Sequence, residues 1–443
     1  MCVLAGLMLA ASGCREFANH RASLESLAAT GQYSQAAAVL DDPKVRAEYG
    51  TRNEVLWELD RGTVALALKE DDAAIKLLSE AEDTTEIQRK QTLGDVAGQW
   101  VLNDTVTRYV AQPYEDIYIN VFKTLAQLQA GRLDGGATVE VRRMASKADL
   151  LRDTYIKYAE AAQAKVGPEL DRARGLVPTN NAGEFIESPL GTFLTAVTFM
   201  KTGDRESQGV AARRLQESIR LQQGIIGPVQ AADFESLETL APASINVLVV
   251  AFSGRGPTKV AERVGPIPLG TVPVYFELPK LQTHPTEVGS ARLEVAGPEG
   301  SLAYRQPLPL VEDLGSVAAE NDRRAMPAIY ARTLVRYALK AGLSVAVTEA
   351  ARRQASDQNQ GWVQLAGVLA GLVVLGATEE ADLRSWLFLP GDARVGLAKL
   401  PAGTQEVRVV YESAGGGDVY TSPWQTIQVT EQGLTTTITW YWR

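Results

Sequence analysis

The sequence predicts an α+β protein in which α-helical hairpin repeats over residues 15–243 precede a β-sandwich-like domain over residues 244–443. The chain has 443 residues, of which 45% are hydrophobic, so it is long enough to form two domains. The first half has helical periodicity with small residues at tight turns. The second half alternates apolar and polar residues between glycine and proline turns, and a helical pattern at about 312–384 interrupts it as an insertion.

Residues 1–14 form an apolar segment that ends in a cysteine. The run from Cys2 to Gly13 is shorter than the ~20 helical residues that span a bilayer. Its end, Ala10-Ala11-Ser12-Gly13-Cys14, resembles the lipobox of bacterial lipoproteins, although Ala11 occupies the position where leucine is commonest. The resemblance implies a lipoprotein signal with diacylglycerol on Cys14, and Arg15 after it implies outer-membrane retention. The alternative is a buried N-terminal helix.

Four units in the first half have the pattern of two helices joined by a tight turn. The clearest unit places small and apolar residues where two helices would cross: Gly62, Ala74, Leu78 and Ala81. The other units centre on residues 31–36, 118–136 and 193–215. Such pairs must stack on one another to bury their apolar faces, which gives a solenoid with a concave groove. The pattern predicts tetratricopeptide-like (TPR-like) repeats, with a plain helical bundle as the alternative.

Pro228 and Pro242 mark a boundary after which the hydrophobic pattern changes period. Residues 245–252 are almost uniformly apolar and of strand length, and the turn Gly254–Pro257 follows them. The prolines between residues 266 and 279 suit edge strands or extended segments. Five further segments have the composition of strands: residues 290–297, 393–400, 406–413, 424–431 and 434–443. Together they predict an antiparallel unit closed by strands from both sides of the helical insertion.

The segment Gly361–Ala377 carries no charged residue, and Gly367 and Gly371 lie one helical turn apart within it. Seventeen residues lie at the lower limit for a membrane-spanning helix. The alternatives are a helix buried in its own domain and a helix that contacts further copies of the chain through Gly367 and Gly371. Strands that bracket the segment are expected to share one sheet, so a single membrane crossing would separate them. We therefore expect a helix that is enclosed by protein, either within its own domain or between the subunits of a homo-oligomer.

Several motifs occur in an order that resembles a family of uncharacterised bacterial envelope lipoproteins with helical repeats. They are Gly254–Pro257, Pro266–Pro268, Leu310–Asp313, Pro327–Ile329 and Thr378–Pro390. The resemblance covers most of the chain after the signal segment and implies an envelope context. It supplies no catalytic residues.

Composition and motifs disfavour most kinds of catalytic or metal chemistry. The formal net charge of −9 gives no basic excess for binding nucleic acid. Only 2 histidines and 2 cysteines are present, which removes most zinc sites and Cys/His nucleophile systems. The acidic clusters at 71–72, 80–83 and 379–382 lack calcium-loop spacing and are expected to be solvated helix ends. Ser253 lacks a nucleophile elbow and His284 has no companion histidine, so no catalytic residue, metal or cofactor is predicted.

These expectations describe a lipid-anchored, periplasm-facing scaffold lipoprotein of the outer membrane, with other envelope proteins as partners. It would bind a partner through its helical repeats and form homo-oligomers. The first alternative is a regulator that activates a peptidoglycan-synthesising enzyme. The second alternative is an envelope hydrolase whose catalytic carboxylates the sequence does not reveal.

Overall fold

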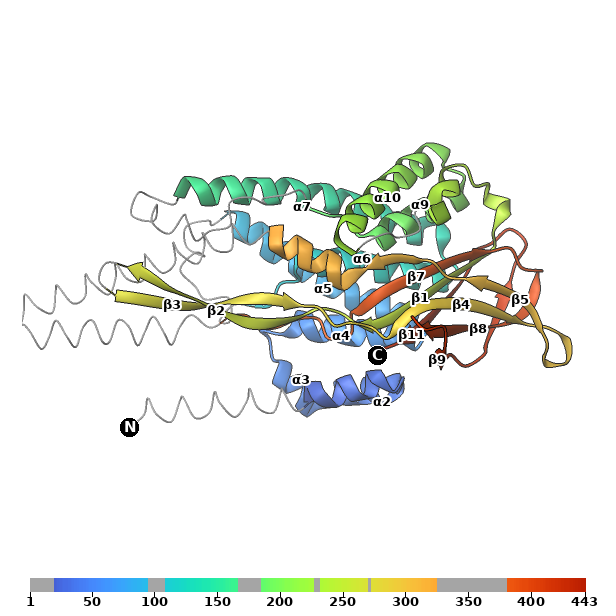
Figure 1. Ribbon diagram of the computed structural model, residues 1–443, viewed down its shortest axis with the longest axis horizontal. Helices are drawn as coiled ribbons and strands as arrows, with labels where there is room; N and C mark the ends of the chain where they lie inside the picture. The colour runs from blue at the N-terminus through green and yellow to red at the C-terminus, as the bar shows by residue number, and fades with distance from the viewer. Residues whose placement is uncertain (1–19, 95–107, 166–184, 227–231, 270–271, 325–380) are drawn as a thin grey trace, which may run out of the picture.

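The structure is a computed structural model that describes residues 20–94, 108–165, 185–226, 232–269, 272–324 and 381–443. Helices fill the N-terminal half and strands fill the C-terminal half, so the chain has the predicted α+β fold class. Figure 1 shows the helices beside the sheets and one long hairpin, β2–β3, projecting away from them. The expected signal segment lies outside the described residues.

The first half folds into helices that pair across short turns. Residues 20–29 are helical, and they precede α2 (Tyr33–Leu40), α3 (Pro43–Tyr49), α4 (Glu54–Ala67), α5 (Asp71–Gly94), α6 (Pro113–Gln129), α7 (Thr138–Lys165), α9 (Pro189–Thr202), α10 (Arg205–Ile226) and α11 (Ala232–Glu235). Helix pairs therefore occur at each of the four places where the sequence predicts them. The clearest pairs are α4 with α5, α6 with α7, and α9 with α10.

Local sequence explains where several helices begin and end. The side chains of Asp42 and Ser188 accept first-turn hydrogen bonds at the starts of α3 and α9, and a proline follows each of them. Gly203 ends α9 in the left-handed conformation, with φ of 78°, which glycine adopts without strain. Asp204 alone separates Gly203 from α10, which begins at Arg205.

Gly62 lies at a close contact between α4 and α5. A Cβ atom at this position would lie 2.9 Å from Cγ of Leu78, and Leu78 itself is fully buried. Ala74 and Ala81, the small residues of the same predicted unit, are fully buried as well. The predicted helix crossing at this unit is confirmed.

The second half forms two sheets and a separate hairpin. The strands are β1 (Val247–Arg255), β2 (Thr258–Leu269), β3 (Val272–Gln282), β4 (Val288–Ala296), β5 (Leu302–Pro307), β6 (Leu310–Asp313), β7 (Pro390–Ala398), β8 (Gly403–Ser413), β9 (Asp418–Thr421), β10 (Gln425–Val429) and β11 (Thr435–Tyr441). The first sheet has the order β11-β1-β7-β6. The second has the order β10-β8-β4-β5, with β9 on β8, and β2 pairs with β3 alone among the described strands.

Strand β1 is buried on both faces, which explains why its sequence is apolar throughout. Leu248, Val250 and Phe252 belong to the large core that the first sheet shares with the helices. Val247 and Val249 alternate with them and belong to a second apolar cluster shared with the other sheet. The first sheet therefore lies between the helices and the second sheet.

The expectation that the β unit is antiparallel throughout is wrong at one position. Strands β1 and β11 pair in parallel, from Val247 beside Thr435 to Ser253 beside Tyr441. A parallel pair needs a long connection. Here the whole chain between residues 255 and 435 supplies it, so the last strand returns to the side of the first.

The strands on either side of the predicted helical insertion, β6 and β7, belong to one sheet. The prediction that the helical pattern continues to about 384 is wrong for residues 381–384, which form no helix, and residues 325–380 lie outside the described residues. Strands β6 and β7 pair antiparallel, with Leu310 beside Arg394 and Asp313 beside Asp392. This confirms the expectation that strands on both sides of the insertion share one sheet. Helix begins after Asp313 rather than at 312, because β6 runs through that residue, and residues 314–324 are helical. Among the described residues, no helix has the length and apolar character needed to cross a membrane.

Trp386 joins the helices to the first sheet. It is 1% exposed, and its indole N–H donates to Oγ1 of Thr63 on α4 at 3.0 Å. Its backbone N–H donates to Oε1 of Glu115 on α6, also at 3.0 Å. Its ring contacts Phe122 edge to face at 5.4 Å between centroids. The end of the 378–390 motif thus has a structural function.

Two buried carboxylates strengthen the same joint. Asp60 accepts a hydrogen bond from the backbone of Leu387 at 2.9 Å. Glu312 of β6 accepts hydrogen bonds from the hydroxyl of Ser188 and from the backbone of Leu190, at the start of α9. Burial raises the pKa of each carboxyl to about 7. Because the folded-state pKa is raised, the stability linked to these groups is greatest at acid pH and falls as pH rises towards 7.

The turn Gly254–Pro257 packs against the start of β7. The backbone N–H of Gly256 donates to the carbonyl of Leu389 at 2.7 Å, and a Cβ at Gly256 would lie 2.7 Å from Cβ of Leu389. A Cβ at Gly391 would lie 2.9 Å from the carbonyl oxygen of Arg255. The glycines are required here by backbone-to-backbone packing, so this turn is not a phosphate loop.

Candidate functional site

The residues that the sequence marks as sites lie outside the described part of the chain. Cys14 precedes residue 20, and Gly367 and Gly371 lie in the range 325–380. Lipidation at Cys14 and copy-to-copy contact at the glycine pair therefore stay predictions.

The acidic clusters have different locations. Asp71 and Asp72 occupy the first turn of α5, where a negative charge suits the helix dipole. Asp382 forms an ion pair with Arg384 at 2.7 Å. Glu82 does not fit the expectation of a solvated helix end, because it is 1% exposed in the middle of α5. Sequence spacing marks an acidic residue but does not show which neighbouring helices cover it.

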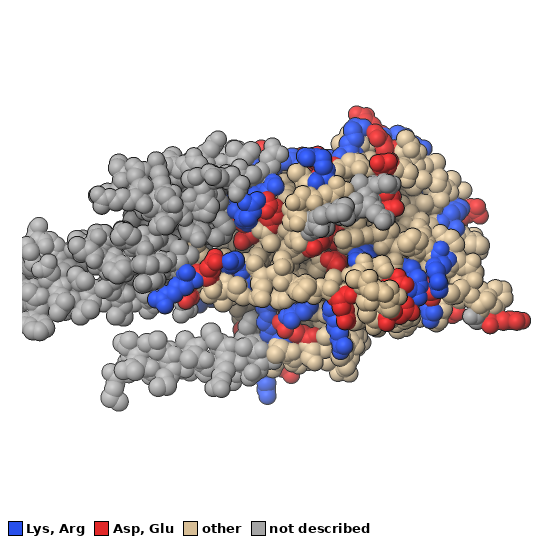
Figure 2. All heavy atoms as spheres, in the orientation of Figure 1, with Lys and Arg blue, Asp and Glu red and all other residues tan. Residues whose placement is uncertain are grey.

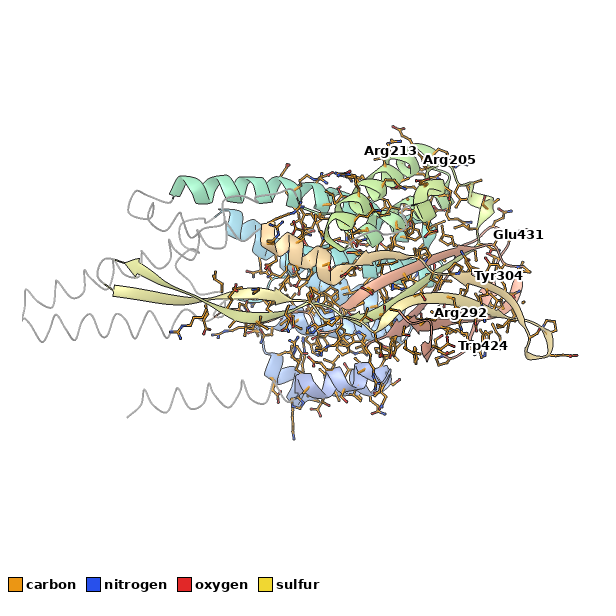
Figure 3. All side chains as sticks on the ribbon, in the orientation of Figure 1. Arg205, Arg213, Arg292, Tyr304, Trp424 and Glu431 are labelled. Atoms are coloured by element: carbon orange, nitrogen blue, oxygen red, sulfur yellow. The ribbon has the colours of Figure 1, made fainter. Side chains whose placement is uncertain are left out.

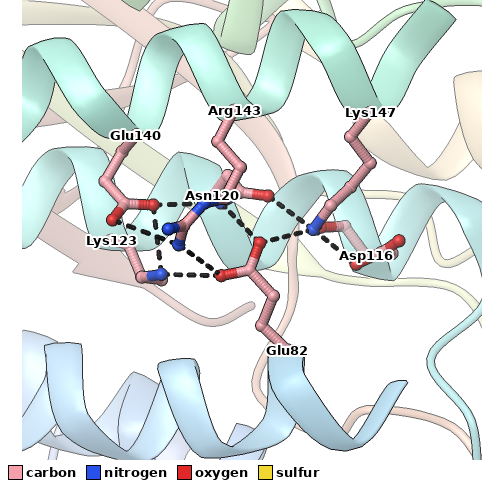
Figure 4. A network of polar contacts seen from close by, with 7 residues as sticks. All are labelled: Glu82, Asp116, Asn120, Lys123, Glu140, Arg143 and Lys147. Carbon is pink, nitrogen blue, oxygen red and sulfur yellow. Dashed lines mark hydrogen bonds and ion pairs between the residues drawn. The ribbon is translucent and has the colours of Figure 1, made fainter. Parts of the chain in front are cut away.

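Glu82 is the centre of a buried ionic network that joins three helices (Figure 4). Its carboxylate accepts hydrogen bonds from Lys123 of α6 at 2.6 Å and from Lys147 of α7 at 2.7 Å. Asn120 of α6 donates to Glu82 at 2.9 Å and to Glu140 at 3.0 Å. The network, hereafter the Glu82 network, comprises Glu82, Asp116, Asn120, Lys123, Glu140, Arg143 and Lys147.

The charges of the Glu82 network balance. Three carboxylates face three cationic groups, and Lys147 contacts both Glu82 and Asp116 at 2.7 Å. Burial alone would raise the pKa of Glu82, but Lys147 and Lys123 outweigh it and lower that pKa to about 2. Glu82 is therefore ionised at neutral pH, and the cations that contact it compensate its charge. This arrangement stabilises helix packing and leaves no carboxylate free for acid–base catalysis.

A small cleft opens between α7, α9 and α10, close to the Glu82 network along α7. Its volume is about 210 Å³. Most of its lining is apolar, from Ile117, Met144, Ala148, Phe199, Val210 and Ala211. Val210 stands at the surface and is 46% exposed, whereas the other five are buried.

Several polar groups that line the cleft are already bonded within the chain. The hydroxyls of Thr192 and Thr195 donate to carbonyls one turn back on α9, at 3.2 and 2.8 Å. The hydroxyl of Ser188 donates to Glu312. At the rim, Glu187 pairs with Arg152 and lies 3.5 Å from Arg214. The interior of the cleft thus offers an apolar surface, and fixed charges of both signs surround part of its mouth.

A second cavity, of about 670 Å³, lies beside the half of β7 that β6 does not cover. Arg394 lines it, is buried, and donates to the carbonyls of Val288 and Gly289 at 3.2 and 3.0 Å. Burial lowers the pKa of Arg394 and raises that of Asp392, 3.9 Å away, to about 7. These contacts tie β7 to the start of β4.

The face of the second sheet that points away from the first carries several ion pairs. Figure 3 labels Arg292 in this region. Arg292 pairs with Glu412 and with Asp418, and the hydrogen bond with Asp418 is the main cause that raises its pKa. Arg408 lies over the ring of Trp424, 4.3 Å from its centroid. Figure 2 shows charged side chains of both signs intermixed over the described surface in this view. This pattern is typical of a solvated face.

The remaining candidates of the sequence have structural surroundings. Ser253 is buried within β1. His284 bonds to the hydroxyl of Thr258 at 2.9 Å, and burial lowers its pKa. Within the described ranges, no group of three or more His, Cys, Asp or Glu residues could hold a metal ion.

Comparison with protein-family models, with curated proteins and with solved structures finds no match for this chain. Membership of an envelope lipoprotein family therefore stays a prediction from the sequence motifs. Two of these motifs contact each other in the structure. They are Gly254–Pro257 and the end of Thr378–Pro390, which are joined by a backbone hydrogen bond from Gly256 to Leu389.

The sequence did not predict the cleft or the Glu82 network. Each is built by three or more helices that are far apart in the chain, so no local spacing reveals it. One signal was present: Glu82, Lys123 and Lys147 are charged residues within otherwise buried helix faces.

Proposed function

We propose that this protein is a lipid-anchored, periplasm-facing scaffold lipoprotein of a bacterial envelope assembly, which binds a partner protein and catalyses no reaction. In this proposal Cys14 carries the lipid that holds the chain at the outer membrane, and Gly367 and Gly371 contact further copies. The helical hairpins are TPR-like repeats, and the stacked sheets form a sandwich-like domain that supports them. The cleft between α7, α9 and α10 is the observation that carries the proposal.

The size and lining of the cleft suit a protein partner better than a small molecule. Pockets for small ligands and cofactors usually have volumes of ~300–1,000 Å³, and this cleft has about 210 Å³. Its volume and apolar interior match one large apolar side chain inserted from a partner. The fixed charges of Glu187 and Arg214 at the rim would orient the segment that carries it. This is the usual arrangement of an anchor pocket on a helical-repeat surface.

A charge at the mouth of the cleft is expected to abolish partner binding. Val210→Glu places a carboxylate beside the apolar lining, so the amount of partner that co-purifies should fall at least about tenfold. Val139→Glu is the matched control, because Val139 is 44% exposed on α7 and does not line the cleft. It should leave co-purification unchanged. Equal loss with both variants, or loss with neither, would contradict the proposal.

A further inference from the structure

The β2–β3 hairpin is a two-stranded ribbon that extends well beyond the two sheets (Figure 1). Its register runs from Thr258 beside Gln282 to Leu269 beside Val272, and no third described strand joins it. At ~3.3 Å per residue, the twelve residues of β2 span roughly 40 Å. Isolated two-stranded ribbons are marginally stable in water, so this one is expected to have a partner.

The composition of the hairpin changes abruptly at the pair Arg263 and Glu277. We call the part of the hairpin nearer the sheets, up to this pair, the base. The base contains every charged residue of the hairpin: Lys259, Glu262, Arg263, Glu277 and Lys280. Within the base, Lys280 pairs with Glu262 at 2.8 Å and Leu278 is buried. Beyond it, residues 264–269 and 272–276, which we call the distal half, contain no Asp, Glu, Lys, Arg or His.

Prolines in the distal half favour lipid over a protein strand as the partner. Pro266, Pro268 and Pro273 have no backbone N–H, which weakens the addition of another strand to either edge. Because these prolines lack N–H groups, the distal half also has fewer backbone hydrogen-bond donors that would have to give up bound water at a membrane surface. Tyr275 and Phe276 come directly before Glu277, and aromatic residues at a boundary between apolar and charged segments are typical of a membrane interface.

The helix that follows the predicted lipid anchor in the chain lies near the start of this hairpin. Arg255, three residues before β2, pairs with Glu25 of the helix over residues 20–29 at 2.9 Å. Residue 20 is six positions after Cys14, and such a segment reaches at most about 20 Å. Val264, where the distal half begins, is six positions after Thr258 and therefore also roughly 20 Å from that residue. A membrane within reach of the lipid on Cys14 would thus meet the hairpin where its charged residues end.

We propose that the distal half of the β2–β3 hairpin inserts into the interfacial layer of a lipid bilayer and acts as a second membrane contact beside the lipid on Cys14. The depth is limited, because the edges of a two-stranded ribbon keep backbone groups that need water or headgroups as partners. One lipid group together with a second apolar contact gives the stable attachment that a single weak contact lacks. This inference rests on the proposed lipid anchor for its geometry, but its test does not require the anchor.

The test uses the full chain with Cys14→Ser and with Leu4, Leu7 and Leu9 changed to serine, so that neither the lipid nor the apolar N-terminal segment contributes and the hairpin is the contact under study. Flotation with vesicles of phosphatidylethanolamine and phosphatidylglycerol measures partitioning. Ile267→Glu should lower partitioning at least about tenfold, because a carboxylate resists leaving water. Val260→Glu, at a 38% exposed position in the base, is the matched control and should leave partitioning unchanged.

A fluorescent probe reports the environment of the tip directly. With Cys2 and Cys14 both changed to serine, Leu269→Cys provides a single site for an environment-sensitive label, and Val260→Cys provides the control site. The label at 269 should shift to the blue when vesicles are added and be quenched by spin-labelled lipid, whereas the label at 260 should not. No vesicle-dependent change at 269 would overturn the inference.

Two other results would also overturn it and would name a different partner. A blue-shifted label at 269 before vesicles are added, with a dimeric mass by light scattering, would mean that a second copy covers the hairpin. A label at 269 that is blue-shifted before vesicles are added, in a protein of monomeric mass, would mean that another part of the same chain covers the hairpin. The lipid anchor is tested separately by palmitate labelling of the unaltered chain, so its failure and the failure of the hairpin inference are distinguishable.

Discussion

Replacing Glu82 with glutamine is expected to lower the free energy of unfolding by about 3–5 kcal/mol, the usual cost of breaking a buried ion pair. The variant keeps the shape of the side chain but removes the negative charge that Lys123 and Lys147 share at 2.6 and 2.7 Å. Both lysines are buried, so one positive charge would stay uncompensated among α5, α6 and α7. Urea denaturation followed by circular dichroism at neutral pH measures the loss.

The effect of Glu82→Gln is expected to depend on pH. The pKa of Glu82 is lowered from 4.5 to about 2 in the folded state. Its contribution to stability is therefore complete above pH 4.5 and is lost as pH falls towards 2, so the difference between the two proteins should shrink over that range. Glu80→Gln is the control, because Glu80 lies exposed on the same helix and should cost less than about 0.5 kcal/mol. Equal losses for both variants would contradict a buried network.

The second large effect is expected from Trp386→Ala, at about 3–5 kcal/mol. The change removes a fully buried ring from the contact with Phe122 and leaves the hydroxyl of Thr63 without its indole donor. Because Trp386 links α4 and α6 to the first sheet, helices and strands should both melt at a lower temperature. Thermal unfolding followed at helix and strand wavelengths measures this directly.

Trp424→Ala is the matched control for that loss. Trp424 is 40% exposed on the second sheet, and its main described contact is the guanidinium of Arg408. Removing the contact should cost less than about 1 kcal/mol. A large shift for Trp424→Ala, or a negligible one for Trp386→Ala, would mean that the helices and the first sheet do not share the core described above.

Elements with strong local patterns could be predicted from the sequence. Residues 245–252 are apolar because both faces of β1 are covered, and Gly62 is small because Leu78 of the next helix occupies the adjacent space. Strand β6 was missed because it has only four residues and runs directly into a helix. Its boundary depends on pairing with β7, which lies almost eighty residues later.

The candidate site could not be predicted for a related reason. The cleft combines residues of α6, α7, α9 and α10, and its apolar character depends on threonine hydroxyls that bond back to α9. Glu82 resembled its exposed neighbours because three acidic residues occur within four positions of α5. Only the packing of α6 and α7 against it shows that it is buried.

The most direct test of the proposed function is crosslinking from the cleft in intact cells. A photo-crosslinking amino acid at Val210 should give one discrete adduct with a partner protein, and the same group at Val139 should give none. Adding Cys14→Ser together with Ile267→Glu should remove most of the adduct, because the chain then lacks both proposed membrane contacts and leaves the membrane on which the partner is held. Adducts of equal yield from both positions, or an adduct at Val210 that persists undiminished with the two changes combined, would contradict a membrane-anchored scaffold that binds through this cleft.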